Sequence, residues 1–341
     1  MPRWTREVER VARKATITDI AARAGVSKAT VSRVLTGNAV VTPEKRDAVL
    51  TAMADLSYRP NLMAKGLAWG RTFTIGVVTP DLASPLYGLI MAGVEAELHL
   101  HGYQALFASG AFQPEPERTA LEHLVARQVD AAIVLGGRLP GSDVVAAVGE
   151  LPLVTVLRGA PDRPEITIDN RHGARIATQH LLSLGHRDVV HITGEAGQQD
   201  TEDRLRGYRE AMAEAGLPPL TVPGGYHEEH GVRAVERLLA EELPCTAIFA
   251  PNDQVAVGVR LALADNGIAV PEDVSLVGFD DLPSVRYAVP PLTTVRQPAR
   301  EMGRAAARAV LALLDGETVV VPEFRPELVV RSSTTRLVSV R

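Results

Sequence analysis

The hydrophobic positions between residues 16 and 35 repeat with the period of a helix, and one break divides them. The first run, residues 17–24, begins beside polar oxygens, of which those of Thr18 and Asp19 suit the capping of a helix start. Gly25 interrupts the run, because glycine enters a turn with positive φ at no steric cost. The pattern predicts two short helices joined by a tight turn, with Ser27 as the N-cap of the second.

The predicted second helix places the apolar side chains of Val31, Val34 and Leu35 on one face and small or polar side chains on the other. Two short helices joined by a glycine-containing turn, with polar groups early in the second, are typical of a helix-turn-helix that reads a DNA major groove. An ordinary helical hairpin, which uses the same turn for packing alone, is the alternative.

A third helix is predicted from Thr42 and Pro43, because a capping hydroxyl followed by proline is a strong helix start. Its apolar stripe consists of Val49, Leu50, Met53 and Leu56. A short amphipathic segment follows and ends in a Gly-Arg linker. We therefore expect a flexible extension over residues 1–15, a helix-turn-helix DNA-binding domain over 16–60, and a hinge helix with linker over 61–71.

From residue 72 onward, apolar runs of strand length alternate with segments of helix length. Strands are expected at residues 73–80, 103–109, 130–136, 151–157, 188–194, 246–251 and 273–279. Helices are expected at residues 84–101, 115–128, 170–184, 201–215, 231–242, 253–266 and 296–315. This alternation predicts an α/β fold of parallel sheets covered by helices on both faces. Because a second round begins at Asn170, residues 72–341 should form two lobes with a ligand-binding cleft at the carboxyl ends of the strands.

The net charge of −5 is unevenly distributed along the 341 residues. Residues 1–71 carry 13 Lys and Arg against 6 Asp and Glu, which leaves the remainder at −12. A basic N-terminal segment and an acidic remainder fit one domain that binds a phosphate-containing partner and another that does not. The single cysteine, Cys245, fits a reducing compartment. No apolar run has the length of a membrane span or a secretory signal, so we expect a cytoplasmic protein without a membrane partner.

Several longer motifs carry a resemblance to a known family. They include TITDIAARAGVSKATVSRVL, VTPEKRDAVL, YRPN, IDNRHGARIATQHLLSLGH, RLRGYREAM, AIFAPNDQVAVGV, VSLVGFDD and PPLTTVRQP. Over Thr16 to Arg331 the chain resembles the lac repressor (LacI/GalR) family of bacterial transcription regulators. The resemblance implies a helix-turn-helix head, a hinge helix and a two-lobed, periplasmic-binding-protein-like core that dimerises.

The resemblance also implies which residues contact DNA. Arg33 matches a position that faces base edges, where a guanidinium can bond guanine O6 and N7 together, whereas Ala29 offers only apolar contact. Leu67 matches the hinge leucine that wedges into the minor groove, and packing within the dimer is its alternative role. For Thr30 and Ser32 the alternative is simple solvation of a helix surface. The expected DNA-binding residues are Thr16, Ser27, Lys28, Ala29, Thr30, Ser32, Arg33, Asn38, Tyr58, Asn61 and Leu67.

A second implied site lies in the cleft of the core. Arg204 matches the arginine that bonds ligand hydroxyls in sugar-responsive relatives, Tyr226 an aromatic that stacks on a ring, and Asp280 a second polar anchor. The expected effector-binding residues are Asp81, Ser84, Tyr87, Arg204, Tyr226, Asn252 and Asp280. An arginine, a carboxylate, an amide and an aromatic plate fit a polyhydroxylated ring. A sugar or sugar derivative is the expected effector, with a purine or nucleoside as the alternative.

Other polar residues near this cleft receive structural interpretations. Asp253 is expected to cap the helix that begins there, and Asp281 to face solvent or a hinge. Asp169 and Asn170 are either a loop cap or ligand groups. Arg158 follows a leucine where the family often has aspartate or glycine, so one usual sugar contact is expected to be absent.

An enzyme is not indicated. The segment His227-Glu228-Glu229-His230 lacks HExxH spacing, Asp280 and Asp281 have no neighbouring nucleophile, and the chain has no GxxxxGK[ST] loop. No catalytic residue, metal or cofactor is expected. A solute-binding protein shares the two-lobed core, but it would need an export signal and no DNA head.

The expected function is sequence-specific DNA binding that controls transcription, as a repressor, with an activator as the open alternative. A homodimer would place two recognition helices on a pseudo-palindromic double-stranded operator. A small molecule in the cleft would change operator affinity allosterically. The last residues contain no leucine heptads, which favours a dimer over a tetramer.

Overall fold

The computed structural model describes residues 15–36, 41–58 and 70–337. The chain divides into two compact units, Met1–Thr72 and Phe73–Arg341. Three predicted DNA-binding residues, Asn38, Asn61 and Leu67, lie outside the described residues, as does most of the predicted hinge segment. Among the described residues, no helix is both long and apolar enough to cross a membrane.

The first unit contains the helices α1 (Ile17–Ala24), α2 (Lys28–Thr36) and α3 (Pro43–Asp55). Each helix contributes one fully buried side chain to a common core, namely Ile20, Val31 and Val49. The predicted apolar stripe of α3 is wrong at Leu50, which is 50% exposed, while Ala52 is buried instead. Val49 is buried, and Met53 and Leu56 pack partly buried against the same core, so only Leu50 departs from the predicted stripe.

Side-chain caps fix the turn between α1 and α2. Thr16, and not Thr18, caps α1: its side chain accepts a hydrogen bond from the backbone N–H of Asp19, and Asp19 Oδ2 accepts one from the N–H of Thr16 at 2.7 Å. Gly25 ends α1 with a φ of 65°, as its position predicts. Ser27 Oγ accepts a hydrogen bond from the N–H of Thr30 at 3.0 Å, which confirms Ser27 as the cap of α2.

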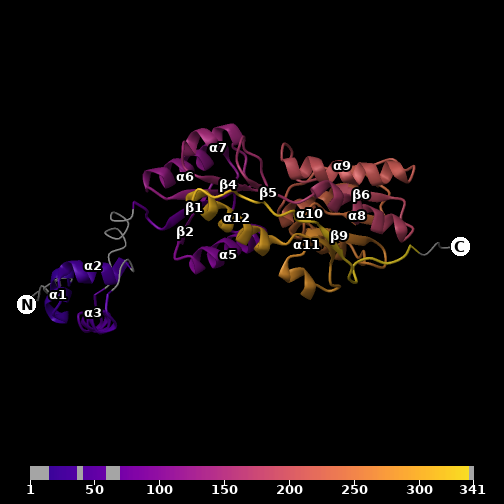
Figure 1. Ribbon diagram of the computed structural model, residues 1–341. Coiled ribbons are helices and arrows are strands. Elements are labelled where there is room, and N and C mark those ends of the chain that lie inside the picture. The colour runs from indigo at the N-terminus through magenta and orange to yellow at the C-terminus, as the bar shows by residue number, and fades with distance from the viewer. Residues whose placement is uncertain (1–14, 37–40, 59–69, 338–341) are drawn as a thin grey trace, which may run out of the picture. The chain divides into compact units, whose positions relative to one another are not determined.

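The second unit consists of two lobes, each built on its own sheet (Figure 1). The first sheet has the order β2-β1-β3-β4-β5, and its strands are parallel. The strands are β1 (Thr74–Thr79), β2 (Gln104–Ser109), β3 (Ala131–Leu135), β4 (Leu153–Val156) and β5 (Glu165–Ile166). Helices α5 (Pro85–Leu100) and α12 (Ala299–Leu314) cover one face, and α6 (Pro114–Ala126) and α7 (Gly141–Val148) cover the other.

The sheet of the second lobe has the order β11-β10-β9-β8-β6-β7, and only β11 pairs antiparallel among these strands. Its strands are β6 (Val189–Ile192), β7 (Leu220–Val222), β8 (Ala247–Phe249), β9 (Ser275–Asp280), β10 (Thr293–Arg296) and β11 (Glu327–Val329). Helices α8 (Asn170–Ser183) and α9 (Gln199–Glu214) cover one face. Helices α10 (Glu228–Ala240) and α11 (Asp253–Asp265) cover the other, and a 3₁₀ helix, η1 (Pro283–Tyr287), follows β9. The α/β fold with parallel sheets is as predicted.

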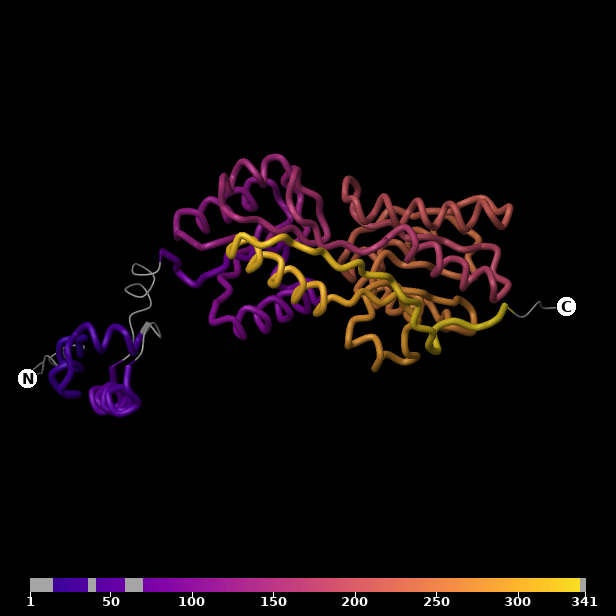
Figure 2. The backbone as a smooth tube through the Cα atoms, viewed as in Figure 1, coloured from indigo at the N-terminus to yellow at the C-terminus, as the bar shows by residue number. Residues whose placement is uncertain are grey.

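The chain passes between the lobes at residues 167–169, 297–298 and 315–326 (Figure 2). Two of these segments run side by side, because Ile168 pairs in parallel with Phe324. The prediction of two successive lobes is therefore incomplete, since α12 comes late in the sequence but packs into the first lobe. The predicted helix over 296–315 begins later, at Ala299, because residues 293–296 form the short strand β10.

Candidate functional site

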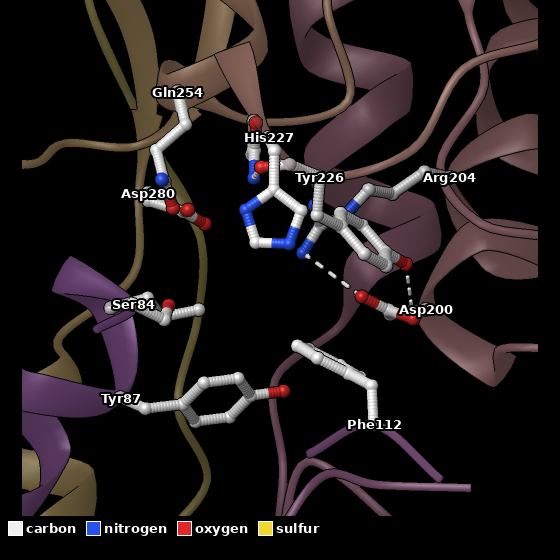
Figure 3. A pocket seen from close by; sticks show the side chains of 11 residues that line it. Ser84, Tyr87, Phe112, Asp200, Arg204, Tyr226, His227, Gln254 and Asp280 are labelled. Atoms are coloured by element: carbon white, nitrogen blue, oxygen red, sulfur yellow. Dashed lines mark hydrogen bonds and ion pairs between the residues drawn. The ribbon is translucent and has the colours of Figure 1, made fainter. Parts of the chain in front are cut away.

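A cavity lies between the two lobes, beside the carboxyl ends of the central strands (Figure 3). Its described lining consists of Ser84, Leu86, Tyr87 and Phe112 from the first lobe and Asp200, Arg204, Tyr226, His227, Asn252, Gln254 and Asp280 from the second. Six of the seven residues predicted for the cleft meet here. The seventh, Asp81, does not line the cavity, and its Oδ1 accepts a hydrogen bond from the N–H of Ala83 at 2.8 Å.

Most of the Arg204 guanidinium, on α9, is engaged by contacts within the protein. Its Nε donates to Asn170 Oδ1 at 2.9 Å, and its Nη1 donates to the carbonyl of Pro251 at 2.5 Å. The guanidinium carbon lies 3.9 Å from the centroid of the Phe279 ring, a cation–π contact. The remaining Nη2 lies 3.7 Å from Asp200 Oδ2. The arginine is only 3% exposed, so its orientation toward the cavity is fixed in advance.

Asp200 joins Arg204 to the aromatic wall of the cavity. The Tyr226 hydroxyl donates to Asp200 Oδ1 at 2.8 Å and lies 2.5 Å from Thr201 Oγ1. Burial raises the pKa of the Tyr226 phenol well above its ordinary value, so the phenol keeps its proton. Asp200 was not predicted, although it lies four residues before Arg204 and so faces the same side of α9.

Asp280, the last residue of β9, is 3% exposed and carries an unusual backbone, with a φ of 114°. Its Oδ1 accepts a hydrogen bond from Gln297 Nε2 at 2.5 Å. Burial raises the pKa of the Asp280 carboxyl to about 7, and the Arg204 charge opposes this rise. A left-handed backbone for a residue with a side chain stores strain, and such residues gather at functional sites.

Asp281 anchors the strained backbone after β9 through ion pairs on the side away from the cavity. We expected it to face solvent or a hinge, but its side chain is 1% exposed and pairs with Arg286, Arg296 and Arg331. The Arg296 Nε lies 2.8 Å from Asp281 Oδ2. The hydrogen bonds from Arg331 and Arg296 help to lower the pKa of Asp281, although burial acts in the opposite direction. The two adjacent aspartates thus have different roles: Asp280 faces the cavity, and Asp281 anchors the backbone.

Asn252 both lines the cavity and takes the capping role that the sequence suggested for Asp253. Asn252 is the N-cap of α11: its Oδ1 accepts from the N–H of Val255 at 2.8 Å, and its Nδ2 donates to the Tyr226 carbonyl at 2.9 Å. Asp253 is fully buried and accepts hydrogen bonds from the N–H of Leu282 and the hydroxyl of Thr294. The prediction of Asp253 as the cap is wrong: α11 begins at Asp253 as predicted, but the preceding Asn252 accepts the hydrogen bond of the first turn. Asp169 does cap α8, accepting from the N–H of His172, whereas Asn170 supports Arg204.

Aromatic rings close the cavity from both lobes. Phe112 lies with its centroid 6.3 Å from that of Tyr87 and 6.4 Å from that of His227, perpendicular to the latter. Burial raises the pKa of Tyr87, so its phenol also stays protonated. His230 Nδ1 accepts from the N–H of His227, and among the described residues no cluster of His, Cys, Asp or Glu is placed to hold a metal ion. The cavity volume is about 30 Å³, room for only one or two water molecules.

Arg158 and Glu117 form a buried ion pair beside the cleft, with exposures of 8% and 1%. Glu117 Oε2 accepts from the N–H groups of Arg138 and Leu139 at 2.9 and 3.1 Å, and the Arg158 guanidinium donates to the carbonyls of Gly136 and Leu139. The pair therefore fixes the loop after β3. Arg158 does not line the cavity that holds Arg204.

In the first unit, α2 turns small and cationic side chains outward. Lys28, Ala29, Ser32 and Arg33 are exposed, as is the cap Ser27, whereas Thr30 is half-buried. The Thr30 hydroxyl lies 2.9 Å from Ser27 Oγ, so these two residues also have a structural role. Tyr58, another predicted DNA-binding residue, packs half-buried against the core of this unit. The outward face of α2 has the size and charge of a helix that enters a DNA groove.

Comparisons with known proteins agree with both units. Residues 16–61 match the family model "Bacterial regulatory proteins, lacI family", and residues 178–334 match "Periplasmic binding protein-like domain". The chain is 37% identical to the HTH-type transcriptional regulator GalR of Escherichia coli, over 94% of this chain and 96% of GalR. It is 32% identical to the HTH-type transcriptional repressor PurR of Haemophilus influenzae, over 94% and 98%.

Solved structures give the same assignment. The lac repressor dimer bound to operator and the anti-inducer ONPF matches with a TM-score of 0.86 and 29% identity, over 95% of this chain and 100% of that one. A complex of the transcriptional regulator CelR with cellobiose matches with a TM-score of 0.69 and 34% identity, over 94% and 99%. The chain belongs to the LacI/GalR family of bacterial transcriptional regulators.

Proposed function

We propose that this protein is a transcriptional repressor that binds a pseudo-palindromic operator as a homodimer and releases or tightens it when a saccharide binds between the core lobes. The observation that carries the proposal is the cavity in which Arg204, Asp200 and Asp280 meet four aromatic rings. Family membership supplies the DNA-binding role. We further infer that the protein is non-catalytic and cytoplasmic, since the relatives that it matches are transcriptional regulators.

The chemistry of the cavity favours a neutral, hydroxyl-rich ring. Asp200 and Asp280 can accept from adjacent hydroxyls, and the Arg204 guanidinium can donate to them. Two carboxylates against one guanidinium disfavour an anionic ligand such as a phosphate ester. The rings of Tyr226 and Phe112 can pack against the apolar face of a sugar. A relative of known structure, CelR, is bound to a saccharide, cellobiose.

A purine or nucleoside is the second candidate, because Phe112 and His227 could stack on a base. A planar base offers few neighbouring hydroxyls to the two buried carboxylates, so the saccharide accounts for more of the lining.

The size of the cavity couples ligand binding to the arrangement of the lobes. Pockets for small organic ligands measure roughly 300–1,000 Å³, whereas this cavity measures about 30 Å³. A ring can enter only if the lobes or the aromatic side chains rearrange. Gln297, the hydrogen-bond partner of Asp280, lies in the segment that connects β10 to α12 of the other lobe. A ligand that competes for Asp280 therefore acts on a connection between the lobes, which is a physical basis for allostery.

An apolar surface on the second lobe is the dimer contact that we propose. Leu261 on α11 is 57% exposed, and Tyr287 and Val289 after η1 are 86% and 84% exposed. Arg260 Nη2 donates to the carbonyl of Val289 at 2.5 Å, which brings the loop against α11. We call Val257, Leu261, Tyr287 and Val289 the α11 patch. Contiguous apolar exposure of this kind is typical of protein–protein contacts.

Selection of bound sequences from random duplex DNA, followed by fluorescence anisotropy, tests the DNA role. Arg33→Ala should lose discrimination between the selected and a scrambled sequence, with a cost of about 1–3 kcal/mol for one base contact. Arg46→Ala on α3, which also removes one exposed arginine, is the matched control and should retain discrimination. Equal discrimination by Arg33→Ala and the unmodified protein would refute the assigned recognition face.

Arg204→Ala tests the cleft. Titration of saccharides and nucleosides into the protein–operator complex should identify a ligand that changes operator affinity, and Arg204→Ala should bind operator normally but no longer respond. A normal response of this variant would show that the effector binds elsewhere. A response to nucleosides alone would select the second candidate.

A further inference from the structure

The cleft contains a second and larger cavity outside the first. We call it the outer chamber. It is lined by residues 137–141 and 157–159 of the first lobe, by residues 196–199 of the second, and by Pro114. Its volume is about 460 Å³, within the roughly 300–1,000 Å³ of small-molecule pockets. The described lining of the inner cavity and that of the outer chamber have no residue in common.

The two cavities are neighbours along the same walls. Phe112 lines the inner cavity and Pro114 the outer chamber, at the start of α6. At the start of α9, Asp200 lines the inner cavity and the preceding Gln199 the outer chamber. A ligand bound at Asp200 can therefore extend past the first turn of α9 into the outer chamber.

The outer chamber differs from the inner cavity in chemistry. Four of its lining residues are glycines, Gly137, Gly141, Gly159 and Gly197, which leave backbone groups accessible. Among its described lining residues none is aromatic, and the side chains of Arg138, Gln198 and Gln199 supply polar groups. This surface can exchange hydrogen bonds with hydroxyls but offers no ring on which a base or an aromatic aglycone could stack.

The charges of the outer chamber disfavour a phosphate group. Each arginine that lines it already has a carboxylate partner: Arg138 Nη2 lies 2.5 Å from Glu195 Oε1, and Arg158 pairs with buried Glu117. An added phosphate would have to compete with these carboxylates. A neutral polar group meets no such competition.

We propose that the effector is a neutral saccharide of at least two rings, with its terminal ring held at Arg204, Asp200 and Asp280 and its next ring in the outer chamber. This inference rests on the proposed saccharide-responsive function and narrows it to a size class. The inner cavity determines which terminal sugar binds. The outer chamber adds affinity for the ring that follows.

Isothermal titration calorimetry of the full chain tests the inference. The probes are methyl glycosides of glucose and galactose, and the disaccharides cellobiose, maltose, lactose and melibiose. At least one disaccharide should bind tenfold or more tightly than the methyl glycoside of its own terminal sugar. Ala196→Trp, at an exposed position in the chamber wall, should remove this advantage and leave binding of the methyl glycoside within twofold.

Two further variants make the result interpretable. Ala240→Trp, at the exposed end of α10 and outside both linings, should keep the disaccharide advantage. Gln198→Ala should reduce it by removing a polar side chain from the chamber without blocking the space. A methyl glycoside that binds as tightly as every disaccharide would overturn the two-ring proposal but leave the saccharide function standing. The same holds if the advantage survives Ala196→Trp. Failure of all saccharides to bind would overturn both proposals.

Discussion

Arg138 Nη2 and Glu195 Oε1 lie 2.5 Å apart and join the first lobe to the second at the edge of the cleft. Both side chains are more than one-third exposed, so the pair contributes under about 1 kcal/mol to unfolding stability. Its position matters more than its strength, because it opposes separation of the lobes. Glu195→Gln should leave the unfolding midpoint in urea nearly unchanged and should alter effector affinity at the cleft.

Small-angle scattering and effector titration check this prediction. Glu323→Gln removes a comparable exposed ion pair, with Arg325 two residues away on the same segment, and serves as the control. If both variants change effector affinity equally, the Arg138–Glu195 pair has no special role in lobe closure.

The buried pair of Arg158 and Glu117 predicts the opposite behaviour. Glu117→Gln leaves the Arg158 guanidinium buried without its counter-charge, and it should lower the free energy of unfolding by roughly 3–5 kcal/mol. The double variant Glu117→Gln/Arg158→Met removes the uncompensated charge and should recover part of that loss. Urea denaturation measures both. A single variant that loses less than 1 kcal/mol would contradict the structural role assigned to this pair.

Asp280 predicts a pH dependence. Burial raises the folded-state pKa of Asp280 to about 7, above the ordinary 3.8, so the folded protein binds this proton more tightly than the unfolded chain. The stability that the proton supplies is complete below about pH 4 and is lost as pH rises through 7. Asp280→Asn should therefore gain stability relative to the unmodified protein between pH 4 and pH 7.

Urea unfolding at several pH values measures this difference, with Asp315→Asn, at the C-cap of α12, as the control. Parallel stability profiles for Asp280→Asn and the unmodified protein would show that the carboxyl titrates normally. Burial and the Asp280 charge both raise the pKa of Asp253, so the difference between the two proteins includes the loss of that charge beside Asp253.

The α11 patch predicts the assembly state. Leu261→Asp puts a charge into the proposed dimer contact and should convert the dimer to a monomer at micromolar concentration. Leu239→Asp on α10, where leucine is 41% exposed, is the matched control and should remain dimeric. Sedimentation velocity distinguishes the two. A Leu261→Asp variant that stays dimeric would place the contact elsewhere, and a stable tetramer of the unmodified protein would contradict the expected dimer.

Local patterns predicted much of the fold. The glycine at residue 25 and the serine at residue 27 identified the turn and cap of the DNA-binding helices, because both depend on neighbours in the chain. The long apolar runs predicted the central strands, since strands covered on both faces are apolar throughout; all five residues of β3 are buried. Short edge strands such as β5 and β11 carry too few residues to give a pattern.

The candidate site was only partly predictable for a related reason. Arg204 and Tyr226 followed from the family resemblance, but the contact between Phe112 and His227 joins residues from different lobes, and no local pattern encodes it. Asp281 was misjudged because its three arginine partners lie 5, 15 and 50 residues away. Burial of a charge depends on such distant partners, which the spacing of one segment does not reveal.

The late return of α12 to the first lobe has a consequence for synthesis of the chain. Met302, Ala306 and Val310 of α12 are fully buried against the first sheet, whose own strands end at Ile166. While the ribosome is still making the second lobe, this apolar face of the first sheet is covered by α5 alone. The first lobe can complete its folding only after residue 314 has emerged, so a nascent chain that stalls in the second lobe exposes a surface that chaperones would recognise.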